Sequence, residues 1–125
     1  MTDTSTNRAI VEDFARIFYA ERDVAGAFAA HVSADYIQHN PNILDGPQAA
    51  VDALKDKFSA DGARFDVMRI LVDDDLALIH LRATRPGAPA AAVADIYRLE
   101  GGKVVEHWDV LQAVPADAVN PKAMF

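Results

Sequence analysis

Cysteine is absent from this sequence of 125 residues, and its absence excludes several kinds of site. Disulfide bonds, zinc–thiolate centres, iron–sulfur clusters and thiol nucleophiles all require cysteine. Long apolar runs are absent too: none approaches the roughly 18 residues of a membrane-spanning helix. The N-terminal segment also lacks the apolar core of a signal peptide. We therefore expect a cytoplasmic protein with no membrane partner.

Positive charge is also scarce. The chain has 12 lysine and arginine residues against 19 aspartate and glutamate residues, which gives a formal net charge of −7. General nucleic-acid binding requires a positive surface, so we expect no nucleic-acid partner. Hydrophobic residues make up 51% of the chain and charged residues 25%, which is typical of globular proteins. Length and composition together predict a single domain over residues 1–125.

Local sequence motifs for nucleotides and metals are missing as well. The sequence has no glycine-rich dinucleotide motif, no P-loop and no HExxH zinc motif, and none of its serines lies in a nucleophile elbow. His39, His80 and His107 lack the paired spacing of metal ligands, so we interpret them as separate pocket or surface histidines. We expect no metal and no cofactor. The chemistry that remains is proton transfer by histidine and carboxylate side chains.

Helical periodicity dominates the first half of the chain. Apolar residues recur at helical spacing up to Phe18, in a helix that Ser5 or Thr6 could cap. A short second helix is expected over residues 24–31, and a third begins at a Gly-Pro pair and covers residues 47–60. The phenylalanines of these helices are predicted to form the core.

Strand signals dominate the second half. Four β-favouring runs are separated by short turns, which indicates antiparallel neighbours; the runs cover residues 65–72, 76–84, 90–99 and 103–114. Helices followed by a strand meander predict an α+β fold. We expect a cone-shaped half-barrel, with the N-terminal helices packed in the concave face of a curved, mostly antiparallel sheet.

The last predicted hairpin carries the candidate catalytic residues. A three-residue turn beginning at Glu100 would pair Asp95 with His107, and strand alternation would place Asp109 on the same face. A two-residue turn would instead pair Asp95 with Trp108 and leave His107 and Asp109 on the opposite face. In the first register the three polar residues line a pocket and move protons. The alternative is a hydrogen-bonded cross-strand pair that only fixes the sheet.

Trp108 is expected on the opposite face of that hairpin. Val104 and Val110 would lie beside it in the same register. A large aromatic residue on the outer face of a sheet suits a contact with a second subunit. We therefore expect a homodimer through the outer sheet face.

Further pocket residues are predicted from the helices and from the segment YIQHNP, residues 36–41. Pro41 disfavours helix at the preceding residue, so this segment is extended or a turn. His39 and Asn40 either bind substrate at the pocket mouth or satisfy local backbone groups of a turn. Phe14 on the first helix and Tyr97 on the hairpin face are expected to line the pocket and bind substrate.

Two segments resemble the SnoaL-like polyketide cyclase group of the nuclear transport factor 2-like superfamily. They are YIQHNP (residues 36–41) and DIYRLEGGKVVEHWDVLQ (residues 95–112), and the resemblance spans residues 10–115. It implies a cone-shaped α+β barrel that encloses one apolar pocket. It also implies a homodimer, commonly formed through the outer sheet face.

The resemblance also implies a reaction. In characterised cyclases of this group, an aspartate at the position of Asp109 is the general base. It removes a proton next to a carbonyl, and the enolate closes a ring by an aldol reaction without metal or cofactor. His107 and Asp95 would help to hold the enolate oxygen. We therefore expect a cofactor-independent acid/base enzyme of aldol-cyclase or isomerase type, acting on a small apolar carbonyl ligand. The alternative is a non-catalytic small-molecule-binding or dimerisation module of the same superfamily.

Overall fold

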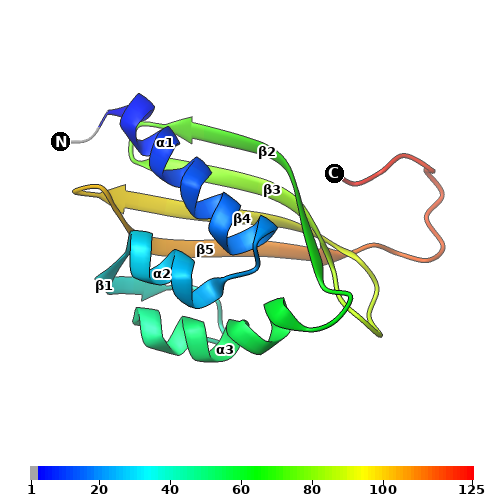
Figure 1. The fold of residues 1–125 in the computed structure, drawn as a ribbon. Helices are drawn as coiled ribbons and strands as arrows, with labels where there is room; N and C mark the ends of the chain where they lie inside the picture. The colour runs from blue at the N-terminus through cyan, green and yellow to red at the C-terminus, as the bar shows by residue number, and fades with distance from the viewer. Residues whose placement is uncertain (1–2) are drawn as a thin grey trace.

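A computed structural model describes residues 3–125 as helices packed on one curved sheet (Figure 1). The helical elements are α1 (Thr4–Ala15), the π-helical turn η1 (Arg16–Ala20), α2 (Val24–His31) and α3 (Pro47–Ser59). The strands are β1 (Val32–Gln38), β2 (Arg64–Asp73), β3 (Leu76–Thr84), β4 (Ala91–Glu100) and β5 (Lys103–Ala113). None of the helices within residues 3–125 has the length and apolar character that crossing a membrane requires.

The predicted helices are confirmed, with one correction at the first cap. Asp3, rather than Ser5 or Thr6, caps α1: its Oδ1 accepts a hydrogen bond from the Thr6 backbone N–H at 2.7 Å. Asp23 caps α2 in the same way through the Gly26 N–H at 2.9 Å. Both carboxylates satisfy amide groups that a helix leaves unpaired at its N-terminus.

The sheet contains one strand more than predicted. Its order is β1-β5-β4-β3-β2; the last four strands form the expected antiparallel meander, and β1 pairs with β5 in parallel. Residues 36–41 were predicted only as extended or turn, because the partner strand of β1 lies some 70 residues later in the chain and leaves no local signal. β1 adds an edge beside the hairpin that carries the candidate catalytic residues.

The concave face of the sheet is covered by the helices, which lie on one side of it in Figure 1. The phenylalanines predicted as core are buried: Phe14 is 1% exposed, and Phe18, Phe28 and Phe58 are also in the core cluster. Their rings contact one another, with centroids 5.1 Å apart for Phe14 and Phe18. The architecture is the expected α+β cone with an unclosed, mostly antiparallel sheet.

The β4–β5 hairpin follows neither of the two predicted registers. Its turn has two residues, Gly101 and Gly102, both with positive φ (58° and 80°), as a tight type I′ turn requires. A β-bulge then shifts the pairing by one residue between Leu99 and Arg98. Beyond the bulge, Tyr97 pairs with His107 and Asp95 pairs with Asp109.

The bulge restores the face that the three-residue turn would have given. An extra residue in one strand exchanges its two faces. As a result Asp95, His107 and Asp109 share the concave face, although Asp95 lies opposite Asp109 and not opposite His107. The same exchange corrects the prediction for Val104: it pairs with Leu99 and is 1% exposed in the core, rather than lying on the outer face.

Candidate functional site

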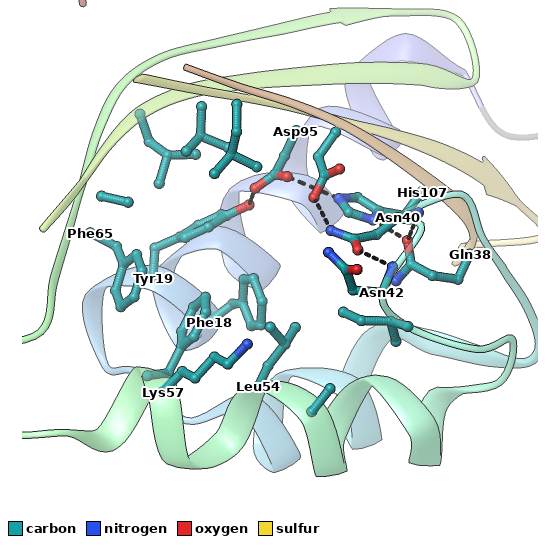
Figure 2. Close-up of a pocket in the computed structure, with 18 of the residues that line it drawn as sticks. Phe18, Tyr19, Gln38, Asn40, Asn42, Leu54, Lys57, Phe65, Asp95 and His107 are labelled. Carbon is teal, nitrogen blue, oxygen red and sulfur yellow. Dashed lines mark hydrogen bonds and ion pairs between the residues drawn. The ribbon is translucent and has the colours of Figure 1, made fainter. Parts of the chain in front are cut away.

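A cavity of about 310 Å³ lies between α3 and the concave face of the sheet (Figure 2). Its wall is mostly apolar, and its members include Phe18, Phe28, Leu54, Phe58, Phe65 and Leu81. Polar side chains from β4, β5 and the end of β1 gather on one side of it. An apolar cavity with a few converging polar groups is the usual form of a small-molecule site.

Most of the predicted site residues meet at this cavity. Asp95, His107, Asp109, Asn40 and Tyr97 all line it. Asp95 and His107 are buried, at 8% and 7% exposure, and Asp109 is half-buried. The strand alternation that brings Asp95, Tyr97, His107 and Asp109 to one face is the feature that assembles this side of the site.

Phe14 does not line the cavity. Its ring packs against Phe18 and against Tyr97, whose centroid is 5.2 Å away, so it belongs to the core behind the cavity wall. The prediction failed because helical periodicity identifies the buried side of α1 but not which buried residue borders empty space.

His39 lies on the outer face of the sheet, not at the pocket mouth. Its ring stacks on Trp108 with centroids 4.9 Å apart and an angle of 3° between the planes. Its Nε2 donates to Glu106 at 2.7 Å; this hydrogen bond, with a second from Arg98, lowers the pKa of Glu106. Residues of an extended segment alternate between two faces, and Asn40 therefore faces inward where His39 faces outward.

The same alternation adds two residues that sequence reasoning missed. Tyr36 and Gln38 precede Asn40 at intervals of two, and both line the cavity. Had residues 36–40 been predicted as a strand, their polar pattern would have marked these side chains as one inward face. The Gln38 amide organises the site: its Oε1 accepts hydrogen bonds from the Asn40 backbone N–H at 3.0 Å and from His107 Nδ1 at 2.7 Å.

The hydrogen bonds of His107 fix the position of its protons. The Asn40 N–H can only donate, so the Gln38 atom that it meets is the carbonyl oxygen, and His107 Nδ1 must donate to that oxygen as well. On the other side of the ring, Nε2 lies 2.9 Å from Asp95 Oδ1. One proton occupies this second bond. The imidazole ring is therefore held at both nitrogens.

Both oxygens of Asp95 are occupied. Oδ1 meets His107, and Oδ2 accepts from the Tyr19 hydroxyl at 2.5 Å. The Tyr19 hydroxyl in turn lies 2.7 Å from the Tyr97 hydroxyl, so Tyr97 donates to Tyr19 and Tyr19 donates to Asp95. Burial, reinforced by the charge of Asp95, raises the pKa of Tyr19 and Tyr97 well above the ordinary value and keeps both phenols protonated.

Tyr19 reaches Asp95 from a π-helical turn. The turn η1 interrupts the regular continuation of α1, with the Glu21 N–H bonded to the carbonyl of Arg16. Single π turns within helices are frequent at functional sites. Sequence reasoning missed Tyr19 because periodicity cannot reveal a π turn.

Asp109 differs from Asp95 in having a free oxygen. Its Oδ2 accepts from Asn40 Nδ2 at 2.8 Å, and the Asn40 amide is oriented by the Asn42 N–H, which donates to Asn40 Oδ1 at 2.9 Å. Within residues 3–125, Asp109 Oδ1 accepts no hydrogen bond and neither oxygen forms an ion pair. Asp109 therefore offers the cavity an acceptor that is oriented but unused.

Tyr36 offers a matching donor. Its hydroxyl oxygen accepts from Gln38 Nε2 at 3.2 Å, and the hydroxyl hydrogen has no acceptor among the described residues. Burial, with the nearby charges of Asp95 and Asp109, raises the pKa of Tyr36, so the hydrogen stays in place. The cavity thus contains one available acceptor, on Asp109, and one available phenolic donor, on Tyr36.

A metal ion is a geometric possibility at the same residues. One ligand atom each from Asp95, His107 and Asp109 lie within 4.8 Å of one another. As the site is folded, however, both nitrogens of His107 and both oxygens of Asp95 already form hydrogen bonds. A cation would have to replace the Asp95–His107 hydrogen bond.

Solved structures of other proteins have the same fold as this chain. The chain resembles the structure of TsrD from Streptomyces laurentii (18% identity, TM-score 0.70, 89% of this chain and 91% of that chain covered). It also resembles a ketosteroid isomerase candidate from Kribbella flavida (20%, 0.73, 98% and 87%) and a polyketide cyclase candidate from Acidithiobacillus ferrooxidans (16%, 0.65, 89% and 91%). At these identities the likeness shows the fold alone.

Sequence comparison identifies the family. No curated protein sequence matches the chain. The family model for the SnoaL-like domain, however, matches residues 11–107, from α1 to the histidine of the buried network. A further structural relative, from Mesorhizobium loti, is an NTF2-like protein of unknown function (20% identity, TM-score 0.74, 88% and 93% covered). The chain therefore belongs to the SnoaL-like domain family, within the NTF2-like fold.

Proposed function

We propose that this protein is a cofactor-independent acid/base enzyme that acts on a small apolar carbonyl compound, by a reaction of aldol-cyclase or isomerase type. The observation that carries the proposal is the free oxygen of Asp109, which faces an apolar cavity that also holds the free hydroxyl hydrogen of Tyr36. Removing a proton next to a carbonyl needs an available base and a donor for the carbonyl oxygen.

Asp109 is the proposed base. It takes a proton from the carbon next to the substrate carbonyl, and the electrons of that C–H bond form the C=C bond of an enolate. Asn40 holds the carboxylate in one orientation through its side-chain amide. Asp95 is less suited to this step because both of its oxygens already accept or share hydrogen bonds.

Tyr36 is the proposed donor to the enolate oxygen. Negative charge develops on the carbonyl oxygen as the proton leaves, and a donor already in place stabilises that charge without reorganisation. In an isomerisation, Asp109 then returns the proton to a different carbon. In an aldol closure, the enolate carbon attacks a second carbonyl of the same molecule, and the new alkoxide takes up the proton.

Asp95 and His107 are proposed to act in catalysis by positioning the donor side of the site. His107 holds the Gln38 oxygen, and the opposite end of the Gln38 amide donates to Tyr36. The cavity volume of about 310 Å³ is at the small end of ligand sites, which favours a compact substrate over a large polycyclic one. Tyr97 and Asn40 would contact that substrate from the cavity wall.

Proton exchange tests the proposal without knowledge of the natural substrate. Small cyclic ketones in D2O would be incubated with the protein, and loss of the proton signal next to the carbonyl would be followed by NMR. We expect exchange with the unmodified protein and with Asp73→Asn, an exposed aspartate outside the cavity, but not with Asp109→Asn. Ketones that bind in the cavity without exchanging would instead support a non-catalytic binding module.

We also propose a homodimer through the outer sheet face. Trp108 lies on that face, half-buried against His39, and Val110 beside it is 65% exposed. The outward positions of β4 near them include Ala94 and Ile96, which face away from the helices. A stable interface buries about 1,600 Å² in total, and the apolar group formed by Ala94, Ile96, Trp108 and Val110 on this face suits the middle of one.

A further inference from the structure

Two basic side chains lie at the cavity, and the proposed reaction uses neither of them. Lys57, in the last turn of α3, and Arg85, just after β3, both line it. Both are exposed, and within residues 3–125 neither side chain forms an ion pair or a hydrogen bond. Their positive charges are therefore available to a ligand.

The side chain of Lys57 extends toward the cavity. Figure 2 shows its side chain extending past Phe18 toward Leu54, on the side of the cavity away from Asp95 and His107. A lysine stem commonly covers apolar surface in this way while its ammonium group stays near water. Because Lys57 is exposed and also lines the cavity, its charge is accessible both from solvent and to a bound ligand.

The cavity consequently carries charges of both signs. The carboxylates of Asp95 and Asp109 and the exposed cations Lys57 and Arg85 all line it, and Figure 2 places Lys57 on the side away from Asp95. The chain as a whole has a net charge of −7, so these basic side chains stand out against an acidic molecule. An anionic group would be repelled by the carboxylates and attracted to the cations.

We propose that the substrate is an apolar carbonyl acid whose anionic group, most simply a carboxylate, binds Lys57 and Arg85 while its reacting carbonyl lies at Asp109. This inference rests on the proposed function and adds the substrate class and its orientation. The two cations fix the orientation of the molecule in the cavity. The apolar wall between the two ends would hold the hydrocarbon part of the substrate.

A matched pair of probes tests the charge preference directly. 2-Naphthylacetate and 2-naphthylacetamide have nearly the same shape and differ in the charge of the head group. Each would be titrated at neutral pH into the isotope-labelled 125-residue chain, with dissociation constants and binding positions read from amide chemical shifts. We expect the acid to bind more tightly than the amide, with shifts near Leu54 and Arg85.

Variants of the two cations complete the test. Lys57→Met and Arg85→Met should each weaken binding of the acid about fivefold, which corresponds to about 1 kcal/mol, and leave the amide unchanged. Lys55→Met removes an exposed lysine of the same helix that does not line the cavity, and should change neither. Equal affinities for the two probes, or equal weakening of both by the Lys57 and Arg85 variants, would overturn the inference.

This result is separable from the test of the proposed function. Asp109→Asn leaves both cations in place, so it should abolish proton exchange and retain the preference for the acid. Exchange without any preference for the acid would refute the inference and leave the proposed base standing.

Discussion

Asp95 and Asp109 lie directly opposite each other on β4 and β5, with both side chains on the concave face of the sheet. Like charges at opposed positions destabilise a sheet, and the protein treats the two carboxylates differently. Asp95 is enclosed by hydrogen bonds from Tyr19 and with His107, whereas Asp109 meets only Asn40. The buried carboxylate therefore has both oxygens occupied, and the open one keeps an oxygen that a ligand could meet.

This difference predicts that replacement by asparagine lowers the free energy of unfolding more at Asp95 than at Asp109. Asp95→Asn replaces a buried carboxylate, which accepts from Tyr19 and meets His107, with a neutral amide that has one accepting oxygen. Hydrogen bonds to a charged group are worth about 1.5–3 kcal/mol, so the free energy of unfolding should fall by about 1–2 kcal/mol. Asp109→Asn can still accept from Asn40, so the free energy of unfolding should change by less than about 0.5 kcal/mol. Denaturant unfolding of the two variants measures both. Equal destabilisation would contradict the distinction.

The tyrosines provide a test by alkaline titration. The chain has three tyrosines, and burial raises the pKa of all of them: Tyr19, Tyr36 and Tyr97. Unfolded tyrosines ionise near pH 10. Above that pH the unfolded chain loses protons that the folded chain retains, so stability is fully present below about pH 10 and falls as pH rises further. Phenolate absorbance should appear together with unfolding. A phenol that ionises normally in the folded protein would contradict the buried network.

Substitution of Phe14 tests whether its ring lies in the core or in the cavity wall. Because it is 1% exposed and contacts other rings on several sides, Phe14→Ala should lower the free energy of unfolding by about 3–5 kcal/mol. Leu54→Ala is the comparison, since Leu54 is only partly buried and borders the cavity, and it should cost less. Thermal or denaturant unfolding gives both values; a smaller loss for Phe14→Ala would place the open space on the α1 side.

The proposed dimer is tested at Val110. An aspartate there puts a charge on the outer face beside Trp108, so Val110→Asp should sediment as a monomer at concentrations where the unmodified chain is a dimer. Leu44→Asp is the control, because Leu44 is 81% exposed in the loop before α3. An unmodified chain that sediments as a monomer at micromolar concentration would refute the dimer.

Local sequence signals predicted the helices and the strand meander because each depends on periodicity within about ten residues. The pairing register of the hairpin was harder to predict. The two-residue glycine turn shifts the pairing by one residue from the three-residue prediction, and the bulge shifts it by one more. Two shifts leave Asp95, His107 and Asp109 on the predicted face, but each residue has a different partner. Because the bulge was not predicted, Val104 was expected on the outer face, whereas it lies in the core.

The candidate site was predictable where it lies on the hairpin and not elsewhere. β1 pairs in parallel with a strand that is distant in the chain, so residues 32–38 gave no local strand signal. Without that strand, the alternation that turns Tyr36, Gln38 and Asn40 toward the cavity could not be predicted. Tyr19 depends on a π turn that no propensity signals. His39 was assigned to the pocket together with its neighbour, although adjacent residues of an extended chain point to opposite faces.

The central claim is that Asp109 removes a proton from a bound carbonyl compound. The most direct measurement is the rate of deuterium exchange next to the carbonyl at saturating ketone, compared between the unmodified protein and Asp109→Asn, with the ketone dissociation constant determined for both. A general base contributes about 10²–10⁴-fold in rate. We expect Asp109→Asn to lower the exchange rate by that factor and leave the dissociation constant within about twofold, since an uncharged ketone gains no charge interaction from Asp109. An unchanged exchange rate in Asp109→Asn would contradict the account.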